Sequence, residues 1–165
     1  MTQQQIAQVV QKQREFFLTG KTLPRAFRTK VLDDLKAAIL RHEADIDAAL
    51  KADLGKSRME GYMCETGMTL AELSWMRRHL AGLMRDKTVY TPIAQVAARS
   101  FQSPSPYGVT LIMSPWNYPL MLTLEPLIDA LAAGNTAVVK PSAYSPATSE
   151  VIRTILAECF PPEYV

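Results

Sequence analysis

The stretch that decides the fold occupies residues 108–142 and reads GVTLIMSPWNYPLMLTLEPLIDALAAGNTAVVKPS. Its first apolar run, Val109 to Met113, is short and predicts a buried β-strand. Leucines spaced four, three and four residues apart predict a helix over about 119–133. A second apolar run, Thr136 to Val139, predicts another buried strand. Because the links are short, we expect a right-handed parallel βαβ unit, the building block of a doubly wound sheet.

Capping residues outside these strands predict one more helix and a further strand. Gly134 is suited to end the first helix. Ser145-Pro146 is a typical helix start, with serine as N-cap and proline as first helical residue, and the helix is expected to run to about Cys159. Residues 163–165 then resemble the start of another strand. Two parallel strands do not complete such a sheet, so we expect the chain to hold only part of it.

The residues before this stretch predict helices and a pair of exposed strands. Apolar residues recur with helical spacing over 3–19, 24–52 and 58–86, which favours three amphipathic helices. Moderate alternation over 88–92 and 96–102 predicts two exposed strands. The fold class indicated is therefore α/β.

Composition excludes several classes of protein. A hydrophobic content of 48% with 21% charged residues is ordinary for a globular chain, and a net charge of +2 does not indicate a nucleic-acid or membrane partner. The longest uncharged stretch, residues 101–124, carries four prolines and cannot span a membrane. Cys64 and Cys159 do not make a disulfide framework, and the two histidines lack a second ligand at helical spacing, so no metal site is predicted. A soluble cytoplasmic protein is expected.

Polar residues follow both predicted strands, as Ser-Pro-Trp-Asn-Tyr-Pro at 114–119 and Lys-Pro-Ser at 140–142. Ligands collect at the carboxyl ends of parallel strands. The Asn117 carboxamide offers two N–H donors, suited to an oxygen that gains negative charge, and Lys140 offers a cation suited to ribose hydroxyls or phosphate. The alternative is that Asn117 caps a turn and Lys140 merely reaches solvent. Their joint occurrence favours a site.

The same stretch resembles the N-terminal part of the cofactor-binding domain of aldehyde dehydrogenases, with the two polar turns at the family's separation. Tyr118, the run FFLTGKT at 16–22 and the run LKADLGKS at 50–57 resemble the class 3 branch, which oxidises aromatic and medium- to long-chain aliphatic aldehydes. The resemblance covers nearly the whole chain. It implies oxidation of an aldehyde to a carboxylate through a thiohemiacetal and a thioester, with hydride passed to NAD or NADP.

This resemblance also implies roles for individual residues. Asn117 is expected to be the side-chain half of the oxyanion hole, and Lys140 to bond the adenosine ribose or a 2′-phosphate. The other implied cofactor-binding residues are Pro115, Trp116 and Ser142, and the implied aldehyde-pocket residues are Tyr118, Met121 and Leu122. Core packing is an equally open role for Met121 and Leu122.

The resemblance divides the chain into three parts. Residues 1–87 are expected to be the N-terminal helical part of the cofactor-binding domain, and residues 105–165 the first βαβα portion of the Rossmann-like NAD(P)-binding domain. Residues 88–104 are expected to be strands of an oligomerisation sheet, which implies a homodimer of the full-length protein. If these strands are unpaired, their free backbone groups favour association with other chains.

One position departs from the family pattern. Many NAD-using relatives have a glutamate where this chain has Ala143, and that glutamate grips the ribose 2′-hydroxyl. Its absence removes a repulsion against the 2′-phosphate of NADP. We therefore predict that the complete enzyme accepts NADP at least as readily as NAD.

The family's nucleophilic cysteine, general-base glutamate and glycine-rich turn lie further along in its members. Cys64 and Cys159 are expected to be buried packing residues. Glu65 and Glu125 are the nearest carboxylate candidates for acid–base work, but surface or capping roles are expected for them. We therefore expect the 165-residue chain alone to be inactive. Two alternatives stay open: a stand-alone truncated nucleotide-binding or assembly module, and an acylating or semialdehyde-specific dehydrogenase of the same superfamily.

Overall fold

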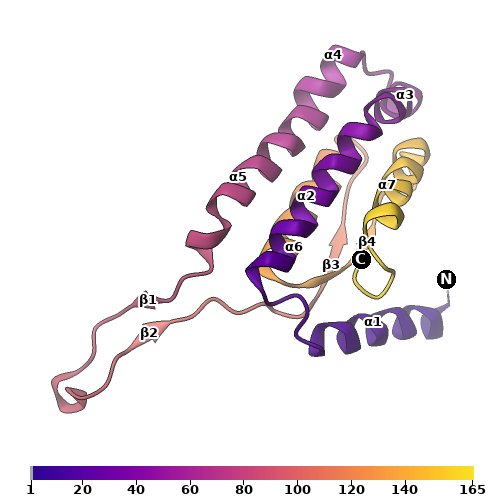
Figure 1. Ribbon diagram of the computed structural model, residues 1–165. Coiled ribbons are helices and arrows are strands. Elements are labelled where there is room, and N and C mark those ends of the chain that lie inside the picture. The colour runs from indigo at the N-terminus through magenta and orange to yellow at the C-terminus, as the bar shows by residue number, and fades with distance from the viewer. Residues whose placement is uncertain (1) are drawn as a thin grey trace.

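The computed structural model describes residues 2–165. Figure 1 shows a layer of helices beside a small sheet, with an arm projecting from one end. The elements in chain order are α1 (Gln3–Leu18), α2 (Arg25–Arg41), α3 (Glu43–Leu54), α4 (Arg58–Gly61), the π-helical turn η1 (Tyr62–Thr66), α5 (Gly67–Leu83), β1 (Lys87–Thr88), the 3₁₀ turn η2 (Ile93–Gln95), β2 (Phe101–Gln102), β3 (Val109–Met113), α6 (Met121–Ala133), β4 (Thr136–Lys140) and α7 (Pro146–Cys159).

The predicted βαβ unit is present. β3 and β4 pair in parallel, from Val109 opposite Thr136 to Met113 opposite Lys140, and α6 connects them. Gly134 ends α6 with a φ of +92°, in the left-handed region that a side chain disfavours. The α/β prediction is therefore confirmed, although most of the described residues are helical.

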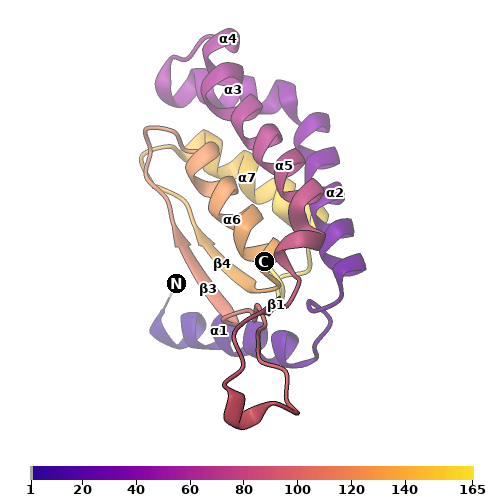
Figure 2. The same ribbon diagram turned by 90° about the vertical axis from the view of Figure 1, so that its left-hand side faces the viewer.

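Helices α2, α5, α6 and α7 form the main packed layer (Figure 2). Leu35 of α2, Leu73 of α5 and Leu127 of α6 are almost completely buried there. Burial of such a side chain stabilises the fold by about 1.5–3 kcal/mol. α1 lies apart from this layer and contacts both strands, where Gln13 Nε2 donates a buried hydrogen bond of 2.6 Å to the Ala137 carbonyl.

The single helix predicted over 24–52 is wrong, because the chain breaks it into α2 and α3 at His42. Neither glycine nor proline marks this break. His42 has φ −96° and ψ 15°, and its ring nitrogens bond Asp45 at 2.8 Å and Glu158 of α7 at 2.9 Å. His42 therefore lies at a joint, not on an apolar stripe, and the bend lets α3 pack along α7.

The helix predicted over 58–86 is continuous from α4 through η1 to α5 and ends at Leu83. Its unpredicted feature is the π turn at Tyr62–Thr66. A Cβ at Gly67 would lie 2.7 Å from the Tyr62 carbonyl oxygen, so the glycine is needed for the close approach of the two backbones. The face of this turn that points to the core carries Glu65, whose side chain is fully buried.

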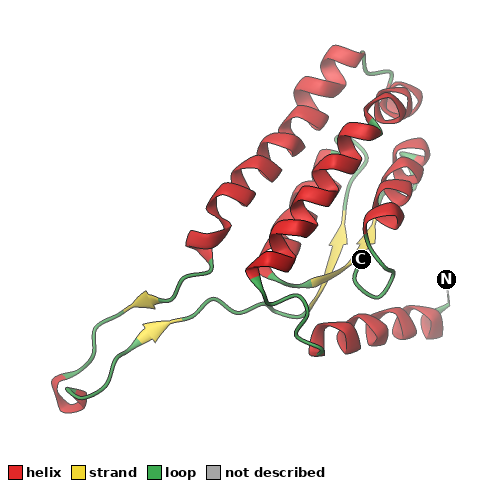
Figure 3. Cartoon of the chain, viewed as in Figure 1, coloured by secondary structure: helices red, strands yellow, loops and turns green. Residues whose placement is uncertain are grey.

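The strand pair predicted over 88–92 and 96–102 is much shorter than expected. Only β1 and β2 pair, antiparallel, and residues 93–95 form η2 at the tip of the arm (Figure 3). Two-stranded ladders without a covering layer are marginal. Arm residues such as Tyr90 and Ile93 are 78% and 84% exposed, so apolar contacts do not extend the ladder.

The prediction of a buried β3 is only half right. Leu111 and Met113 are 64% and 67% exposed, so α1, which also contacts β3, leaves these two side chains uncovered within residues 2–165. At the other edge of the sheet, the Ala137 amide donates to the Tyr164 carbonyl at 3.0 Å. Tyr164 is buried against Phe16, Phe27 and Phe160. Residues 162–164 form a turn and not the expected start of a strand, and this turn meets the edge of β4 through the bond to Ala137.

Candidate functional site

The two polar turns meet at the carboxyl ends of β3 and β4. The Ser114 amide donates to the Lys140 carbonyl at 3.3 Å, which continues the strand pairing into the turns. The rings of Trp116 and Tyr144 lie edge to face with centroids 5.4 Å apart. Because parallel strands end at one edge of the sheet, residues 23 positions apart in sequence, such as Asn117 and Lys140, belong to the same corner of the molecule.

Asn117 is exposed and its carboxamide has no hydrogen-bond partner among residues 2–165. Its backbone is fixed instead, since its carbonyl accepts a hydrogen bond of 3.1 Å from Lys56 Nζ. The strand end before Asn117 is hydrogen-bonded to α6. Ser114 Oγ and Thr123 Oγ1 lie 2.6 Å apart, and Thr123 Oγ1 also donates to the Pro119 carbonyl. A free carboxamide on a fixed backbone is suited to binding a ligand oxygen.

The turn after β4 borders a groove of about 810 Å³ between that strand and α7. Lys140 and Ala143 line it and are exposed. The buried Ser142 also lines it, but its hydroxyl accepts from the Tyr144 amide at 3.2 Å and its carbonyl accepts from Ser149 Oγ at 3.1 Å. Ser142 therefore shapes the turn, and its predicted contact with a cofactor stays a prediction.

The remaining predicted site residues lie around Asn117. Pro115 and Trp116 are exposed, which suits the cleft lining predicted for them. The Tyr118 ring is 38% exposed and covers Lys56, whose Nζ lies 4.1 Å from the ring centroid. Met121 and Leu122 begin α6 and are half-buried, so both the pocket and the packing alternatives stay open.

The main feature that the sequence reasoning missed is a buried ion pair beneath the first turn. Glu65 was expected to be a surface or capping carboxylate, and the structure shows it fully buried and capping. Its Oε1 accepts from Lys56 Nζ at 2.5 Å and its Oε2 accepts from the Leu120 amide at 2.8 Å. α6 has no acidic residue in its own first turn, so Glu65 supplies the negative charge that its amino terminus favours. No sequence pattern near Asn117 indicates the contact between Glu65 and Leu120, since 55 residues separate them.

A second missed contact starts α7. The predicted N-cap Ser145 makes no side-chain cap bond, and Asp53 of α3 takes that role. Its carboxylate accepts from the Ala147 amide at 3.1 Å and from both the Thr148 amide and hydroxyl at 2.7 Å. The LKADLGKS run therefore serves both turns, through Asp53 and Lys56.

Comparison with known proteins agrees with this architecture. The sequence profile described as "Aldehyde dehydrogenase family" matches residues 1–165. The chain belongs to the aldehyde dehydrogenase family. It is 41% identical over 152 residues to the 4,4'-diaponeurosporen-aldehyde dehydrogenase of Staphylococcus aureus, covering 92% of this chain and 33% of that protein. It resembles the solved structure "Substrate bound state of Staphylococcus Aureus AldH" with a TM-score of 0.94 and 40% identity, over 96% of this chain and 35% of that one.

Relatives of the class 3 type support the same assignment. The chain is 37% identical to rat aldehyde dehydrogenase family 3 member A2, over 90% of this chain and 31% of that protein. It is 38% identical to the dog protein named "Aldehyde dehydrogenase, dimeric NADP-preferring", over 93% of this chain and 34% of that protein. The chain therefore spans about a third of the length of these relatives.

The cysteines of this aldehyde dehydrogenase chain are half-buried rather than buried as predicted. Burial, with Glu158 and Asp34 nearby, raises the pKa of the Cys159 thiol to about 11. A thiol with such a pKa stays protonated at neutral pH and is a poor nucleophile. Among residues 2–165, no cluster of His, Cys, Asp or Glu could hold a metal ion, and no helix is long and apolar enough to cross a membrane.

Glu125 lies on α6 and is half-buried, not at the surface. Burial raises its pKa, and the neighbouring carboxylates of Glu72 and Asp129 raise it further. These carboxylates belong to the interface of α5 and α6.

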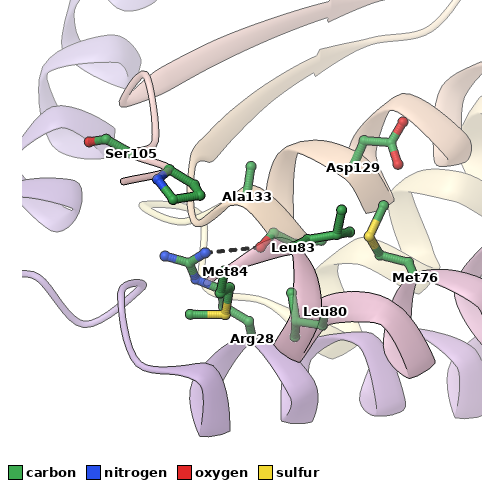
Figure 4. Close-up of a pocket in the computed structure, with 10 residues that line it drawn as sticks. Arg28, Met76, Leu80, Leu83, Met84, Ser105, Asp129 and Ala133 are labelled. Carbon is green, nitrogen blue, oxygen red and sulfur yellow. Dashed lines mark hydrogen bonds between the residues drawn. The ribbon is translucent and has the colours of Figure 1, made fainter. Parts of the chain in front are cut away.

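A smaller cavity of about 190 Å³ lies at the opposite end of α6 (Figure 4). Arg28 lines it and donates from Nη1 to the Ala132 carbonyl at 3.1 Å and from Nε to the Thr22 carbonyl at 2.9 Å. Burial lowers the pKa of Arg28. A Cβ at Gly134 would lie 2.5 Å from Arg28 Nη2, so the glycine that ends α6 is needed for the close approach of this guanidinium.

Proposed function

We propose that the complete protein is a class 3-type aldehyde dehydrogenase that oxidises an aromatic or medium- to long-chain aliphatic aldehyde to a carboxylate. The observation that carries this proposal is the exposed Asn117 carboxamide, held on a fixed backbone at the same edge of the sheet as Lys140. Family membership supplies the reaction class. The thiolate nucleophile and the general base would come from residues beyond these 165.

Asn117 acts as a donor to the aldehyde oxygen. When a thiolate adds to the carbonyl carbon, that oxygen gains a negative charge, and a preorganised N–H stabilises it. Loss of one such donor typically costs about 2.7–4 kcal/mol of transition-state stabilisation, which is a factor of about 10²–10³ in kcat. Tyr118, with Met121 and Leu122 at the start of α6, would offer the aldehyde chain an apolar wall.

NAD or NADP would bind along the groove beside Lys140. The groove fits such a ligand because its polar rim carries an exposed ammonium, and because Ala143 leaves space without negative charge. Lys140 would hold a ribose hydroxyl or a 2′-phosphate, and Pro115 and Trp116 would line the cleft. The bound cofactor supplies the hydride acceptor. The NADP-preferring dog relative supports the prediction that NADP is used at least as readily as NAD.

The arm of β1 and β2 supports a homodimer of the full-length protein. Its apolar residues Tyr90, Ile93 and Val96 are at least 78% exposed, and unpaired strand edges favour association. Sedimentation velocity of the full-length protein is expected to give a dimer, and a monodisperse monomer would argue against this role of the arm.

The deciding experiment compares Asn117→Ala with the exposed Gln8→Ala as control, in the full-length protein. With an aromatic aldehyde and NADP, Asn117→Ala should lower kcat about 10²–10³-fold and leave the KM for NADP unchanged. Gln8→Ala should change neither constant. A kcat within about threefold of the unsubstituted enzyme would refute the assigned role of Asn117.

The same assays test the cofactor. The value of kcat/KM for NADP should equal or exceed that for NAD, and Ala143→Glu should shift the preference toward NAD by restoring the repulsion. A strong NAD preference of the unsubstituted enzyme contradicts the proposal. Added coenzyme A distinguishes the acylating alternative, which would yield a thioester of coenzyme A in place of the free acid.

A further inference from the structure

The ion pair of Lys56 and Glu65 contacts the Asn117 turn at several points. Lys56 belongs to the link between α3 and α4, and Glu65 belongs to η1. In Figure 2, α4 lies at the same end of the molecule as the turn between β3 and α6. The side chains of Lys56 and Glu65 are 9% and 0% exposed, so the pair lies beneath the turn and out of solvent.

Each group of the pair holds a different part of the turn. Lys56 Nζ donates to the Asn117 carbonyl at 3.1 Å and lies 4.1 Å from the centroid of the Tyr118 ring. Glu65 Oε2 accepts from the Leu120 amide at 2.8 Å and from the Met121 amide at 3.4 Å. The salt bridge of 2.5 Å ties these two sets of contacts together. The backbone is therefore fixed immediately at Asn117 and again three residues later.

Lysine suits this position because its ammonium has three donors on one atom. Among residues 2–165 they have three targets: the Glu65 carboxylate, the Asn117 carbonyl and the face of the Tyr118 ring. An arginine side chain spreads its donors over a planar fork and cannot reproduce this arrangement about a single point.

The Asn117 carboxamide has no partner of its own in residues 2–165, so its orientation depends on the backbone that carries it. We propose that Lys56 and Glu65 are positioning residues that fix the Asn117 carboxamide for the aldehyde oxygen, an inference that rests on the proposed function of Asn117. Displacement of a catalytic group by about 1 Å can cost about 10²-fold in rate. The pair therefore acts on kcat through Asn117, without touching substrate or cofactor.

The test is a double-mutant cycle in the full-length enzyme. Removal of one partner alone leaves a buried charge and endangers folding. We therefore use the neutral pair Lys56→Met with Glu65→Gln, in which the introduced carboxamide can still accept from the Leu120 amide while the bond to the Asn117 carbonyl is lost. Lys30→Met is the matched control, since it removes a lysine from an exposed ion pair with Asp34.

In the native background, the neutral pair should lower kcat about 10–10²-fold and leave the KM for NADP unchanged, whereas Lys30→Met should change neither. In the Asn117→Ala background, the neutral pair should change kcat by less than about threefold, because its effect passes through the missing carboxamide. In the native background with Glu65 retained, Lys56→Arg should not keep the kcat of the unsubstituted enzyme.

Two results overturn the inference. One is an unchanged kcat for the neutral pair in the native background, and the other is an equal loss in both backgrounds, which would show that the pair acts independently of Asn117. The proposed function fails in a separate way, through an unchanged kcat of Asn117→Ala alone. Circular dichroism of each variant verifies that the fold is retained.

Discussion

The turns after β3 and β4 both lie at one edge of the sheet, but they are held in different ways. The first is fastened from outside by the buried charges of Lys56 and Glu65. The second is fastened largely from within, because the Ser142 carbonyl accepts from the Ser145 amide at 3.4 Å and from Ser149 Oγ at 3.1 Å. Buried charges stabilise only as a pair, so the first turn should be the more sensitive to single substitutions.

The largest effect is expected for Glu65→Ala. This substitution leaves the Lys56 ammonium buried without its counter-charge and the Leu120 amide without an acceptor. The free energy of unfolding should fall by about 3–5 kcal/mol, the range for a broken buried ion pair. Chemical denaturation of the full-length protein measures it, with exposed Glu60→Ala as the control that stays within about 0.5 kcal/mol. A loss below about 1 kcal/mol for Glu65→Ala would mean that the pair carries little of the turn's stability.

A smaller effect is expected where α7 begins. Asp53 is only half-buried, and Asp53→Ala removes an N-terminal cap without leaving a buried charge behind. The free energy of unfolding should fall by about 1–2 kcal/mol, as for other helix caps. Asp53→Asn retains an acceptor oxygen for the Thr148 amide and should recover part of the loss. If Asp53→Ala destabilised the protein as much as Glu65→Ala, the contrast between the two turns would be wrong.

The same contrast explains how much the sequence could predict. The stretch 108–142 contains its own signals: the apolar runs that form β3 and β4, the leucine spacing of α6 and the glycine at its end. Each of these depends on neighbours within a few residues, so the βαβ unit and the location of Asn117 and Lys140 at its edge could be predicted without a structure.

The contacts that fasten these residues join distant segments and could not be predicted in this way. Glu65 lies 55 residues from Leu120, and Asp53 lies 95 residues from Thr148. The break at His42 also lies at a long-range contact, because the His42 ring bonds Glu158, 116 residues away. A glutamate inside an amphipathic helix is usually a solvated residue, and only the π turn that precedes Gly67 brings this one to the core face.

The prediction of two longer strands over 88–92 and 96–102 was wrong for a different reason. Alternation over 88–102 is a sound signal for a strand only where another layer or strand buries one face. Within residues 2–165 nothing covers the arm, and the ladder reduces to two residues on each side.

The smallest effect concerns the joint at His42, which ties α2 and α3 to the helix that follows the second turn. Hydrogen bonds to Asp45 and Glu158 raise the pKa of His42 above its ordinary 6.5. Hydrogen bonds from His42 and Arg41 lower the pKa of Glu158 below its ordinary 4.5. A raised histidine pKa stabilises the folded state fully below pH 6.5, and the stabilisation is lost as pH rises through the folded value. The lowered glutamate pKa stabilises the fold above pH 4.5 and is lost on acidification.

The cluster should therefore stabilise the protein most between these two pH values and less at pH 8. His42→Gln should flatten the change in denaturation midpoint between pH 6 and pH 8, whereas the exposed Gln8→Ala should leave it unchanged. Added salt should weaken the effect in the native protein, since the carboxylates of the cluster are exposed. If the denaturation midpoint of His42→Gln changed between pH 6 and pH 8 as much as that of the native protein, other titrating groups would be responsible for the pH dependence. In that case the bend between α2 and α3 would depend on packing against α7 and not on the charge of the histidine.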